Sequence, residues 1–452
     1  MTDTGNTAAA GPSGRETDLR NYALVTAAYW ADTIADGAIR ILVLFYFYER
    51  GYTPFQLATI FAFYEIFGII TNLVGGFLAA RLGLKATLVM GLATQVCALA
   101  MLGFAPDSWL VVAYVMAAQA LSGIAKDLTK MSSKSAVKLV VADDEHGTLY
   151  RWVSILTGSK NALKGVGFFV GGLLLTVTSF QTAMLLLAAM VLAALILTVP
   201  FMHGSLGRAD RTARFKHMFS NNRAVNILAA ARIFLFASRD VWFVVGLPVF
   251  LRTELDWTFW QVGTFMAVWV IGYGIVQAST PRLVRRRSAE HGAPDGRTAA
   301  RLAFVLAAFP AAIAIALGAG IDPGTVIVVG LIAFGIIFAL NSAVHSYLIL
   351  AYADNDKVAM SVGFYYMANA CGRLAGTLLS GLLYQWQGLE ACLWASAVFV
   401  LAAGLLSLLL PSQAPGRRRD AQPGATLATN AAVSARTSSR LVSLKISWRA
   451  PA

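Results

Sequence analysis

Twelve apolar stretches, each long enough to cross a lipid bilayer, constrain the fold of this chain more than any other feature. A bilayer core about 30 Å thick is crossed by roughly 20 helical residues. Backbone amides in lipid must be paired within their own segment, so we predict that each stretch is a helix. The predicted spans are 22–48, 55–79, 86–105, 109–133, 150–177, 181–201, 224–250, 258–280, 299–319, 324–351, 359–385 and 389–411.

Composition agrees with a membrane protein. Only 13% of the 452 residues are charged, and the mean hydropathy is +0.65. A typical soluble domain is about 25% charged. These values exclude an ordinary soluble enzyme, a disordered protein and a nucleic-acid-binding domain. The fold class predicted from the sequence is therefore an all-α membrane protein with 12 transmembrane helices.

Basic residues in the loops predict the orientation. The loops after the odd-numbered spans are short and hold two basic residues, Arg50 and Arg252. By the positive-inside rule, both termini and the loops after the even-numbered spans are predicted to be cytoplasmic. Those loops hold Arg81, Lys85, Lys138, Arg208, Arg211, Arg214, Lys216, Arg223, Arg282, Arg285, Arg286, Arg287 and Arg297.

The longest internal linker, 202–223, divides the spans six and six. Shifting the chain by 205 residues places Asn72 on Gln277, a weak sign of two parallel six-helix repeats. The predicted organisation is a cytoplasmic tail 1–20, a six-helix half 21–201, a central cytoplasmic loop 202–223, a six-helix half 224–411 and a basic tail 412–452. The last segment is predicted to be disordered and to contact anionic lipid or to have no role.

Charged residues inside the predicted spans are the candidate functional residues. A charge at mid-bilayer costs on the order of 2.5–3.5 kcal/mol, so it normally faces a water-filled cavity or a partner. Lys126 and Lys130 are one helical turn apart, as are Lys160 and Lys164. Asp127 alone cannot neutralise these lysines and Lys134, which favours an anionic ligand among them.

The second half contributes arginines, whose planar guanidinium suits phosphate-like oxyanions. Arg239 and Arg373 are expected near mid-depth, whereas Arg232 is expected to brace helices or reach the membrane surface. We predict that the substrate binds to Lys126, Lys130, Lys160, Asn161, Lys164, Arg239, Asn369 and Arg373.

Carboxylates in the same spans are candidates for coupling or charge balance. Asp36 and Arg40 are one turn apart, which favours an ion pair between them. Asp32 and Glu65 are then left as possible proton carriers. His345 is interpreted as a packed or hydrogen-bonded residue rather than a proton relay. The full set is Asp32, Asp36, Arg40, Glu65, Asp127, Asp240 and His345.

No sequence pattern for catalysis is found. Cys97, Cys371 and Cys392 lie in apolar runs without metal-ligand spacing and are interpreted as core residues. The Gly272-Tyr273-Gly274 run lies in a predicted span, which excludes a dinucleotide loop. We expect no catalytic residue, no cofactor, no metal and no nucleic-acid partner.

The loop after the second span resembles a motif of the major facilitator superfamily, Gly-x-Leu-Ala-Asp-Arg-x-Gly-Arg-Lys. The run from Gly76 to Lys85 keeps the Gly, Leu, Arg, Gly and Lys of that motif, with Ala80 in place of its Asp. The resemblance implies a gating role for Gly76, Arg81, Gly83 and Lys85. In that family the motif's charges hold helices together on the cytoplasmic side, and Ala80 removes one of these charges. The run Gly167-Phe-Phe-Val-Gly-Gly172 resembles an exporter signature of that family, and either helix packing or coupling explains its glycines.

Longer runs resemble the organoarsenical efflux permeases of bacterial arsenic-resistance operons. The most specific stretch is Gly147–Gly165, and further runs are Leu121–Leu128, Ser238–Val245 and Trp269–Gln277. In that family, glyceraldehyde-3-phosphate dehydrogenase makes 1-arseno-3-phosphoglycerate and the permease exports it across the bacterial cytoplasmic membrane. The resemblance therefore implies a small anionic substrate, that dehydrogenase as its supplier, and membrane lipid as the surroundings.

Two alternatives stay open. One is an antiporter of organic anions or phosphate esters unrelated to arsenic. The other is a membrane sensor or scaffold that recruits a cytosolic enzyme through its basic loops, which would leave the cations inside the spans unexplained.

Overall fold

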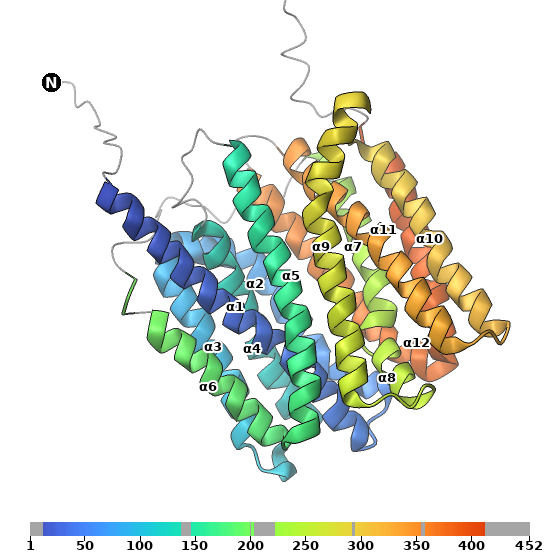
Figure 1. Cartoon of the computed structure of the whole chain (residues 1–452), viewed down its shortest axis with the longest axis horizontal. Helices are drawn as coiled ribbons and strands as arrows, with labels where there is room; N and C mark the ends of the chain where they lie inside the picture. Colours follow the sequence, from blue (N-terminus) through green and yellow to red (C-terminus); the bar gives the residue numbers. More distant parts are fainter. Residues whose placement is uncertain are drawn as a thin grey trace, which may run out of the picture. The chain divides into compact units, whose positions relative to one another are not determined.

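The predicted spans coincide with helices in the computed structural model of the chain (Figure 1). The structure describes residues 12–136, 146–198, 200–202, 222–291, 294–353 and 358–411, and no strand occurs among them. The helices are α1 (Pro12–Glu49), α2 (Pro54–Leu82), α3 (Leu84–Phe104), the short 3₁₀ helix η1 (Asp107–Trp109), α4 (Val112–Ala136), α5 (His146–Val177), α6 (Phe180–Thr198), α7 (Arg223–Phe243), α8 (Gly246–Thr253), α9 (Phe259–His291), α10 (Gly296–Gly318), α11 (Pro323–Tyr352) and α12 (Val358–Leu408).

Three helices differ from the predicted bounds. The first begins at Pro12, so residues 12–20 extend α1 instead of belonging to a separate tail. The seventh span is divided into α7 and α8, and at the break the backbone amides of Val245 and Gly246 donate to the hydroxyl oxygen of Ser380 in α12. The eighth span continues as α9 to His291, so residues 281–291, predicted as part of a loop, are helical. The last two spans meet at Gln387 and Gly388, whose non-helical conformations divide α12 at a kink, where the sequence predicts a break. Gly388 has φ +70°, a conformation that glycine adopts without steric cost.

Nine helical segments of the described chain are long and apolar enough to cross a membrane. One of them, Gly363–Leu408, contains the kink and is long enough for two spans. The helices α1 and α4 fall outside this group because charges interrupt their apolar runs, namely Asp32, Asp36 and Arg40 in α1 and Lys126, Asp127 and Lys130 in α4. The all-α fold with 12 membrane helices is consistent with these segments.

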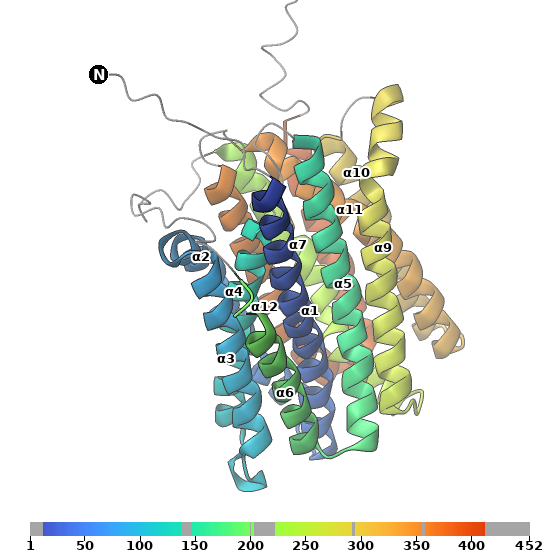
Figure 2. The ribbon, with the colours of Figure 1, turned by 60° about the vertical axis from the view of Figure 1, so that its left-hand side comes forward.

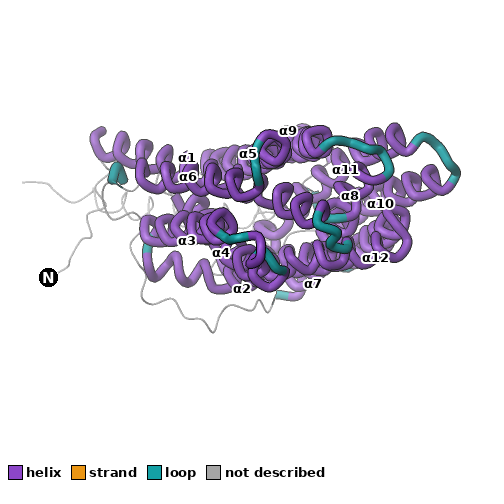
Figure 3. The backbone as a smooth tube through the Cα atoms, turned by 90° about the horizontal axis from the view of Figure 1, so that it is seen from below, coloured by secondary structure: helices purple, strands orange, loops and turns teal. Residues whose placement is uncertain are grey.

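The helices pack in two neighbouring groups. Most helices of α1–α6 contact mainly one another, as do most of α7–α12, whereas α5 and α9 have their most extensive contact with each other. Figure 2 shows α1 running between α5 and α6. The two groups meet where α2 contacts α12 and where α5 contacts α9, and α5 and α9 lie side by side in Figure 3.

Glycines allow α5 to approach both of its neighbours closely. A Cβ at Gly167 would lie 2.8 Å from the Cα of Gly37 in α1, and one at Gly172 would lie 2.8 Å from the carbonyl oxygen of Phe259. Gly263 of α9 faces Gly172 across the same contact. The glycines that resemble an exporter signature therefore form a packing surface, which favours the packing explanation.

Part of the loop motif is described. Gly83 separates α2 from α3 with φ +82°, which explains why glycine suits this turn. The ammonium of Lys85 donates to the carbonyl oxygen of Met202 at 3.0 Å. The surroundings of Gly76 and the side chain of Arg81 are not described, so a gating role stays a prediction.

The described helices belong to one compact unit that ends at Leu410. Residues 1–11, most of the central loop 202–223, and the tail from residue 412 lie outside the described residues, as does the side chain of Lys134. The predicted boundaries of the two halves, and the predicted orientation of the termini, stay predictions.

Candidate functional site

Charged side chains from six helices meet inside the helix bundle, and we call them the central cluster. It begins on α1, where the Asp36 carboxylate accepts hydrogen bonds from the Tyr64 hydroxyl and from the Lys164 ammonium, the latter at 2.8 Å. Lys164 lies on α5, so this ion pair joins α1 to α5 while Tyr64 joins both to α2. The members of the cluster are Asp32, Asp36, Arg40, Glu65, Lys126, Asp127, Lys130, Lys164, Arg239, Asp240 and Arg373.

A chain of ion pairs crosses from one helix group to the other. Glu65 of α2 is fully buried and accepts from Arg40 of α1 at 2.7 Å and from Arg373 of α12. The Nε of Arg373 lies 3.3 Å from Asp240 of α7, and the Nε of Arg239 donates to the same carboxylate at 2.6 Å. Glu65 and Asp240 therefore share Arg373, and their pairing holds α2 and α7 to α12.

The lysines of α4 converge on one carboxylate. Asp127 lies 2.5 Å from the ammonium of Lys130 and 3.6 Å from that of Lys126. Asn72 of α2 donates to Asp127 at 2.9 Å and accepts from Lys130 at 2.6 Å. The ammonium of Lys126 also lies 4.0 Å from the centre of the Tyr64 ring, a distance suited to a cation–π contact.

Asp32 differs from the other carboxylates of the cluster. Its Oδ2 accepts from the Thr129 hydroxyl at 2.5 Å, and its buried Oδ1 has no hydrogen-bond partner among the described residues. The side chain is 1% exposed and forms no ion pair within the described chain. A buried carboxylate without a cation is unfavourable when charged, so Asp32 is suited to hold a proton.

Arg232 forms no ion pair with the central cluster among the described residues, and its hydrogen-bond partners are neutral. Its Nε donates to Asn369 Oδ1 at 3.2 Å, and its Nη1 donates to the carbonyl and hydroxyl oxygens of Ser342 at 3.2 and 3.1 Å. The hydroxyls of Tyr273 and Ser342 are 3.3 Å apart, and the Gln277 amide donates to Ser342 at 3.4 Å. Arg232 is 4% exposed and points into the bundle. Of the two expectations for Arg232, these contacts agree with bracing, because they join α7 to α11 and α12, whereas its burial does not agree with a position at the membrane surface.

The remaining predicted site residues extend this arrangement. Asn161 of α5 donates to Gln277 of α9 at 2.7 Å, which links the two helix groups. His345 of α11 is completely buried, and neither ring nitrogen has a hydrogen-bond partner among the described residues. Lys160 lies on α5 one turn before Lys164 and is half-buried.

The observed pairing departs from the sequence interpretation in two respects. Asp36 pairs with Lys164 and Arg40 pairs with Glu65, whereas the sequence favoured a pair between Asp36 and Arg40. The lysines and arginines were expected to bind an anionic ligand, but Lys126, Lys130, Lys164, Arg239 and Arg373 each contact a carboxylate of the chain itself. Tyr64, Thr129 and Ser342 were not predicted, because a lone hydroxyl in an apolar span carries no charge to draw attention.

Basic side chains nevertheless exceed carboxylates within the described membrane helices. The carboxylates inside the bundle are Asp32, Asp36, Glu65, Asp127 and Asp240. The basic residues inside it are more numerous, namely Arg40, Lys126, Lys130, Lys160, Lys164, Arg232, Arg239 and Arg373. The side chains of Lys164, Arg239 and Arg373 retain 18%, 17% and 16% exposure. The arrangement can therefore accept an anion, which would replace a carboxylate as partner of a cation that is already in place.

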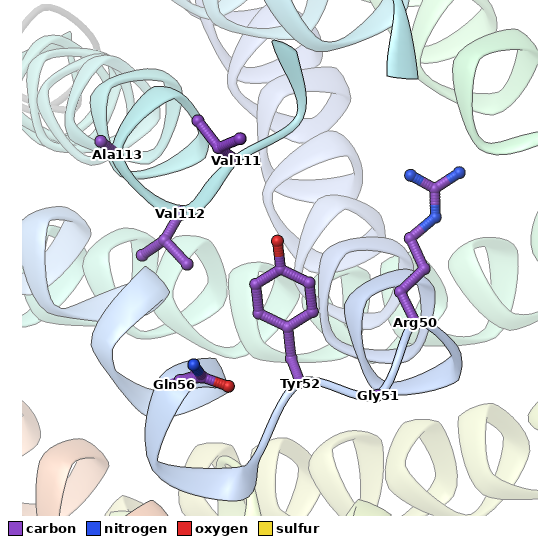
Figure 4. A pocket seen from close by; sticks show the side chains of 7 residues that line it. All are labelled: Arg50, Gly51, Tyr52, Gln56, Val111, Val112 and Ala113. Carbon is purple, nitrogen blue, oxygen red and sulfur yellow. The ribbon is translucent and has the colours of Figure 1, made fainter. Parts of the chain in front are cut away.

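Ionisable residues at the loop end of the bundle form a separate network. Asp107 in η1 accepts hydrogen bonds from Arg50, Tyr46 and Gln181, and the bond from Arg50 contributes most to a pKa below the ordinary aspartate value. A surface depression next to it is lined by residues 50–52, Gln56 and residues 111–113, with the Tyr52 ring projecting into it (Figure 4). This depression does not contain the central cluster. No group of three potential metal ligands is found among the described residues.

Comparisons with known proteins agree with the fold. The family described as the Major Facilitator Superfamily matches residues 25–349. The human organic anion transporter MFSD10 (TETRAN) has a similar structure, with a TM-score of 0.65, 15% identity, and coverage of 86% of this chain and 99% of that one. A POT family transporter in complex with a thioalcohol-conjugated peptide gives a TM-score of 0.69 at 12% identity, covering 86% and 95%. No curated protein matches the sequence.

Proposed function

The chain belongs to the Major Facilitator Superfamily, and on that premise we propose that it exports an organoarsenical phosphate ester, 1-arseno-3-phosphoglycerate, and so confers arsenate resistance. It is a multi-pass membrane transporter of that superfamily. The substrate rests on the resemblance of residues 147–165 and the other runs to organoarsenical efflux permeases. In this proposal the protein lies in the bacterial cytoplasmic membrane with both termini in the cytoplasm.

One structural observation supports an anionic substrate above others. Lys164 of α5, Arg239 of α7 and Arg373 of α12 come from different helices of the two groups and meet in one partly accessible cluster. A multiply charged anion can bind several of these cations at once without drawing new charges into the membrane. This is the physical reason for preferring transport over a scaffold that acts only through its loops.

The proposed transport cycle uses partner exchange in the cluster. The oxyanion replaces Asp36 beside Lys164, or Asp240 beside Arg239, as the two helix groups move around the site. The pair between Glu65 and Arg373 spans the groups, so its geometry must change when they rotate. Asp32, which is hydrogen-bonded to a hydroxyl and has no ion pair within the described chain, is a better proton carrier than Glu65.

Everted membrane vesicles test this proposal. Vesicles carrying the protein are supplied externally with arsenate, glyceraldehyde 3-phosphate, NAD and purified glyceraldehyde-3-phosphate dehydrogenase, the proposed supplier of substrate. Arsenic is expected to enter only with the complete mixture, because free arsenate is not the proposed substrate. Vesicles that lack the protein are the matched control.

The outcome also separates the alternatives. Uptake of arsenic without the dehydrogenase would contradict export of the ester. Uptake of labelled 3-phosphoglycerate, with no arsenic uptake from the complete mixture, would favour an organic-anion or phosphate-ester antiporter.

A further inference from the structure

We infer that Arg232, Ser342, Tyr273 and Gln277 form a second anion subsite, distinct from the central cluster, that binds a phosphate-type oxyanion at one end of the substrate. The inference rests on the proposed function for the anionic nature of the substrate, but not on arsenic. Its first support is the environment of the guanidinium.

The charge of Arg232 is buried without a carboxylate partner. Arg40, Arg239 and Arg373 each contact a carboxylate, whereas Arg232, among the residues that the structure describes, donates only to neutral oxygens of Asn369 and Ser342. Removing a cation from water without an opposite charge is costly in a medium of low dielectric constant. An anion held against Arg232 would offset that cost.

Aromatic rings leave one edge of the guanidinium for such an anion. The guanidinium carbon Cζ of Arg232 lies 4.0 Å from the centre of the Phe236 ring and 4.9 Å from that of the Tyr365 ring. Stacking on rings is compatible with in-plane hydrogen bonds, which are the ones that bind oxyanions. Two of its nitrogens bind neutral oxygens, and Nη2 donates no hydrogen bond to any described residue.

The neighbouring donors suit an oxyanion with several oxygens. The Ser342 hydroxyl is shared by Arg232, Tyr273 and Gln277, so three donors already converge on one oxygen position. An oxyanion beside Ser342 would accept from the same groups. Four neutral or cationic donors with no carboxylate among them favour phosphate over a metal cation.

The subsite lies next to the lysines of α5. Asn161 donates to Gln277, and Lys160 and Lys164 occupy the same helix as Asn161 within one turn. A ligand bound by Arg232 can therefore extend toward α5 and the central cluster. One oxyanion would lie at Arg232 and the other at the lysines.

Ligand binding to purified protein tests the subsite independently of arsenic. The probe is 3-phosphoglycerate, with inorganic phosphate as a second probe, and the readout is the dissociation constant from thermal shifts in detergent. Arg232→Gln is expected to raise the dissociation constant roughly tenfold or more, since a charge-assisted hydrogen bond to the anion is lost. Ser342→Ala and Tyr273→Phe are expected to raise it several-fold. Arg301→Gln, at an exposed position of α10, is the matched control and should leave it unchanged.

The design separates binding from bracing of helices. If Arg232→Gln lowers the melting temperature but leaves the dissociation constant of both probes unchanged, the residue only braces α7 against α11 and α12, and the subsite is rejected. If Arg232→Gln does not fold, the test uses Ser342→Ala and Tyr273→Phe instead. An unchanged dissociation constant in both variants rejects the subsite. Binding that depends on Arg232, in a protein that exports no arsenic from the vesicles, would refute the proposed function and retain the subsite.

Discussion

At the scale of single residues, the central cluster shows how charges are accommodated inside an apolar bundle. Each of Asp36, Glu65, Asp127 and Asp240 contacts a cation from a different turn or helix. Removing one member of a buried pair leaves an uncompensated charge, whereas removing both can be nearly neutral. Comparing the stability and the export of single and double variants therefore separates a structural role of a pair from a role in transport.

The pair of Asp36 and Lys164 allows that separation. Lys164→Ala is expected to abolish export, because Asp36 then keeps only Tyr64 and the substrate loses a cation. The single change should also lower the free energy of unfolding by about 1–3 kcal/mol. This is less than the cost of breaking most buried ion pairs, because Lys164 is partly exposed to solvent. The double variant Asp36→Asn with Lys164→Gln should regain stability without regaining export, measured by thermal unfolding and vesicle uptake. Wild-type export by the double variant would show that the pair is structural only.

Asp107 outside the membrane helices predicts a pH dependence of stability. Hydrogen bonds from Arg50, Tyr46 and Gln181 lower its pKa in the folded protein. Its contribution to stability is therefore complete above the unfolded value of about 4 and is lost as pH falls through the lowered folded pKa. The difference in melting temperature between wild type and Asp107→Asn should be constant from about pH 5 to pH 8 and shrink below about pH 4. A difference that grows on acidification would contradict this assignment.

At the scale of helices, the sequence predicts positions better than contacts. Apolar run length determines where a membrane helix lies, so predicted bounds such as 324–351 agree with α11 (Pro323–Tyr352). The break within α12 at Gln387 and Gly388 likewise lies between the predicted spans 359–385 and 389–411. The break between α7 and α8 was not predicted, because it depends on a contact with Ser380 of α12, and hydropathy does not record contacts with neighbouring helices.

The packing of α5 against α9 gives a prediction with a close control. Gly172→Ala places a Cβ 2.8 Å from the Phe259 carbonyl oxygen, so the helices must separate. The expected loss is roughly 1–3 kcal/mol of stability, as for other overpacked contacts. Gly272→Ala in α9 meets no atom within 4 Å and should be neutral or stabilising by up to about 1 kcal/mol. Thermal unfolding of both variants is the measurement, and equal effects would show that the close approach of α5 and α9 is not required.

At the scale of the whole molecule, residue types alone could not predict the candidate site. The sequence identified Lys164, Arg239 and Arg373 because charges are rare in apolar spans. It could not assign their partners, since Glu65 and Arg373 are far apart in the chain and meet only because α2 packs against α12. The same contact places Arg373 between the two helix groups, where rotation of the groups would change its distance from Glu65. Motion between the groups is therefore the largest-scale consequence of the proposed function.

A reversible cross-link between α2 and α12 tests that motion. A Cβ at Gly381 would overlap both the Cβ of Ala58 and the backbone carbonyl oxygen of Pro54. A bridge between Ala58→Cys and Gly381→Cys therefore requires α2 and α12 to move apart by roughly 1 Å, toward the Cβ separation of about 3.8 Å typical of a disulfide. In a background with Cys97, Cys371 and Cys392 replaced by alanine, we expect export from the reduced double variant and none after oxidation, because the two groups cannot separate at this end. Reductant should restore uptake in the same vesicles, which controls for folding. Each single-cysteine variant should be insensitive to oxidant, and export by a fully cross-linked protein would show that transport proceeds without opening at the contact of α2 with α12.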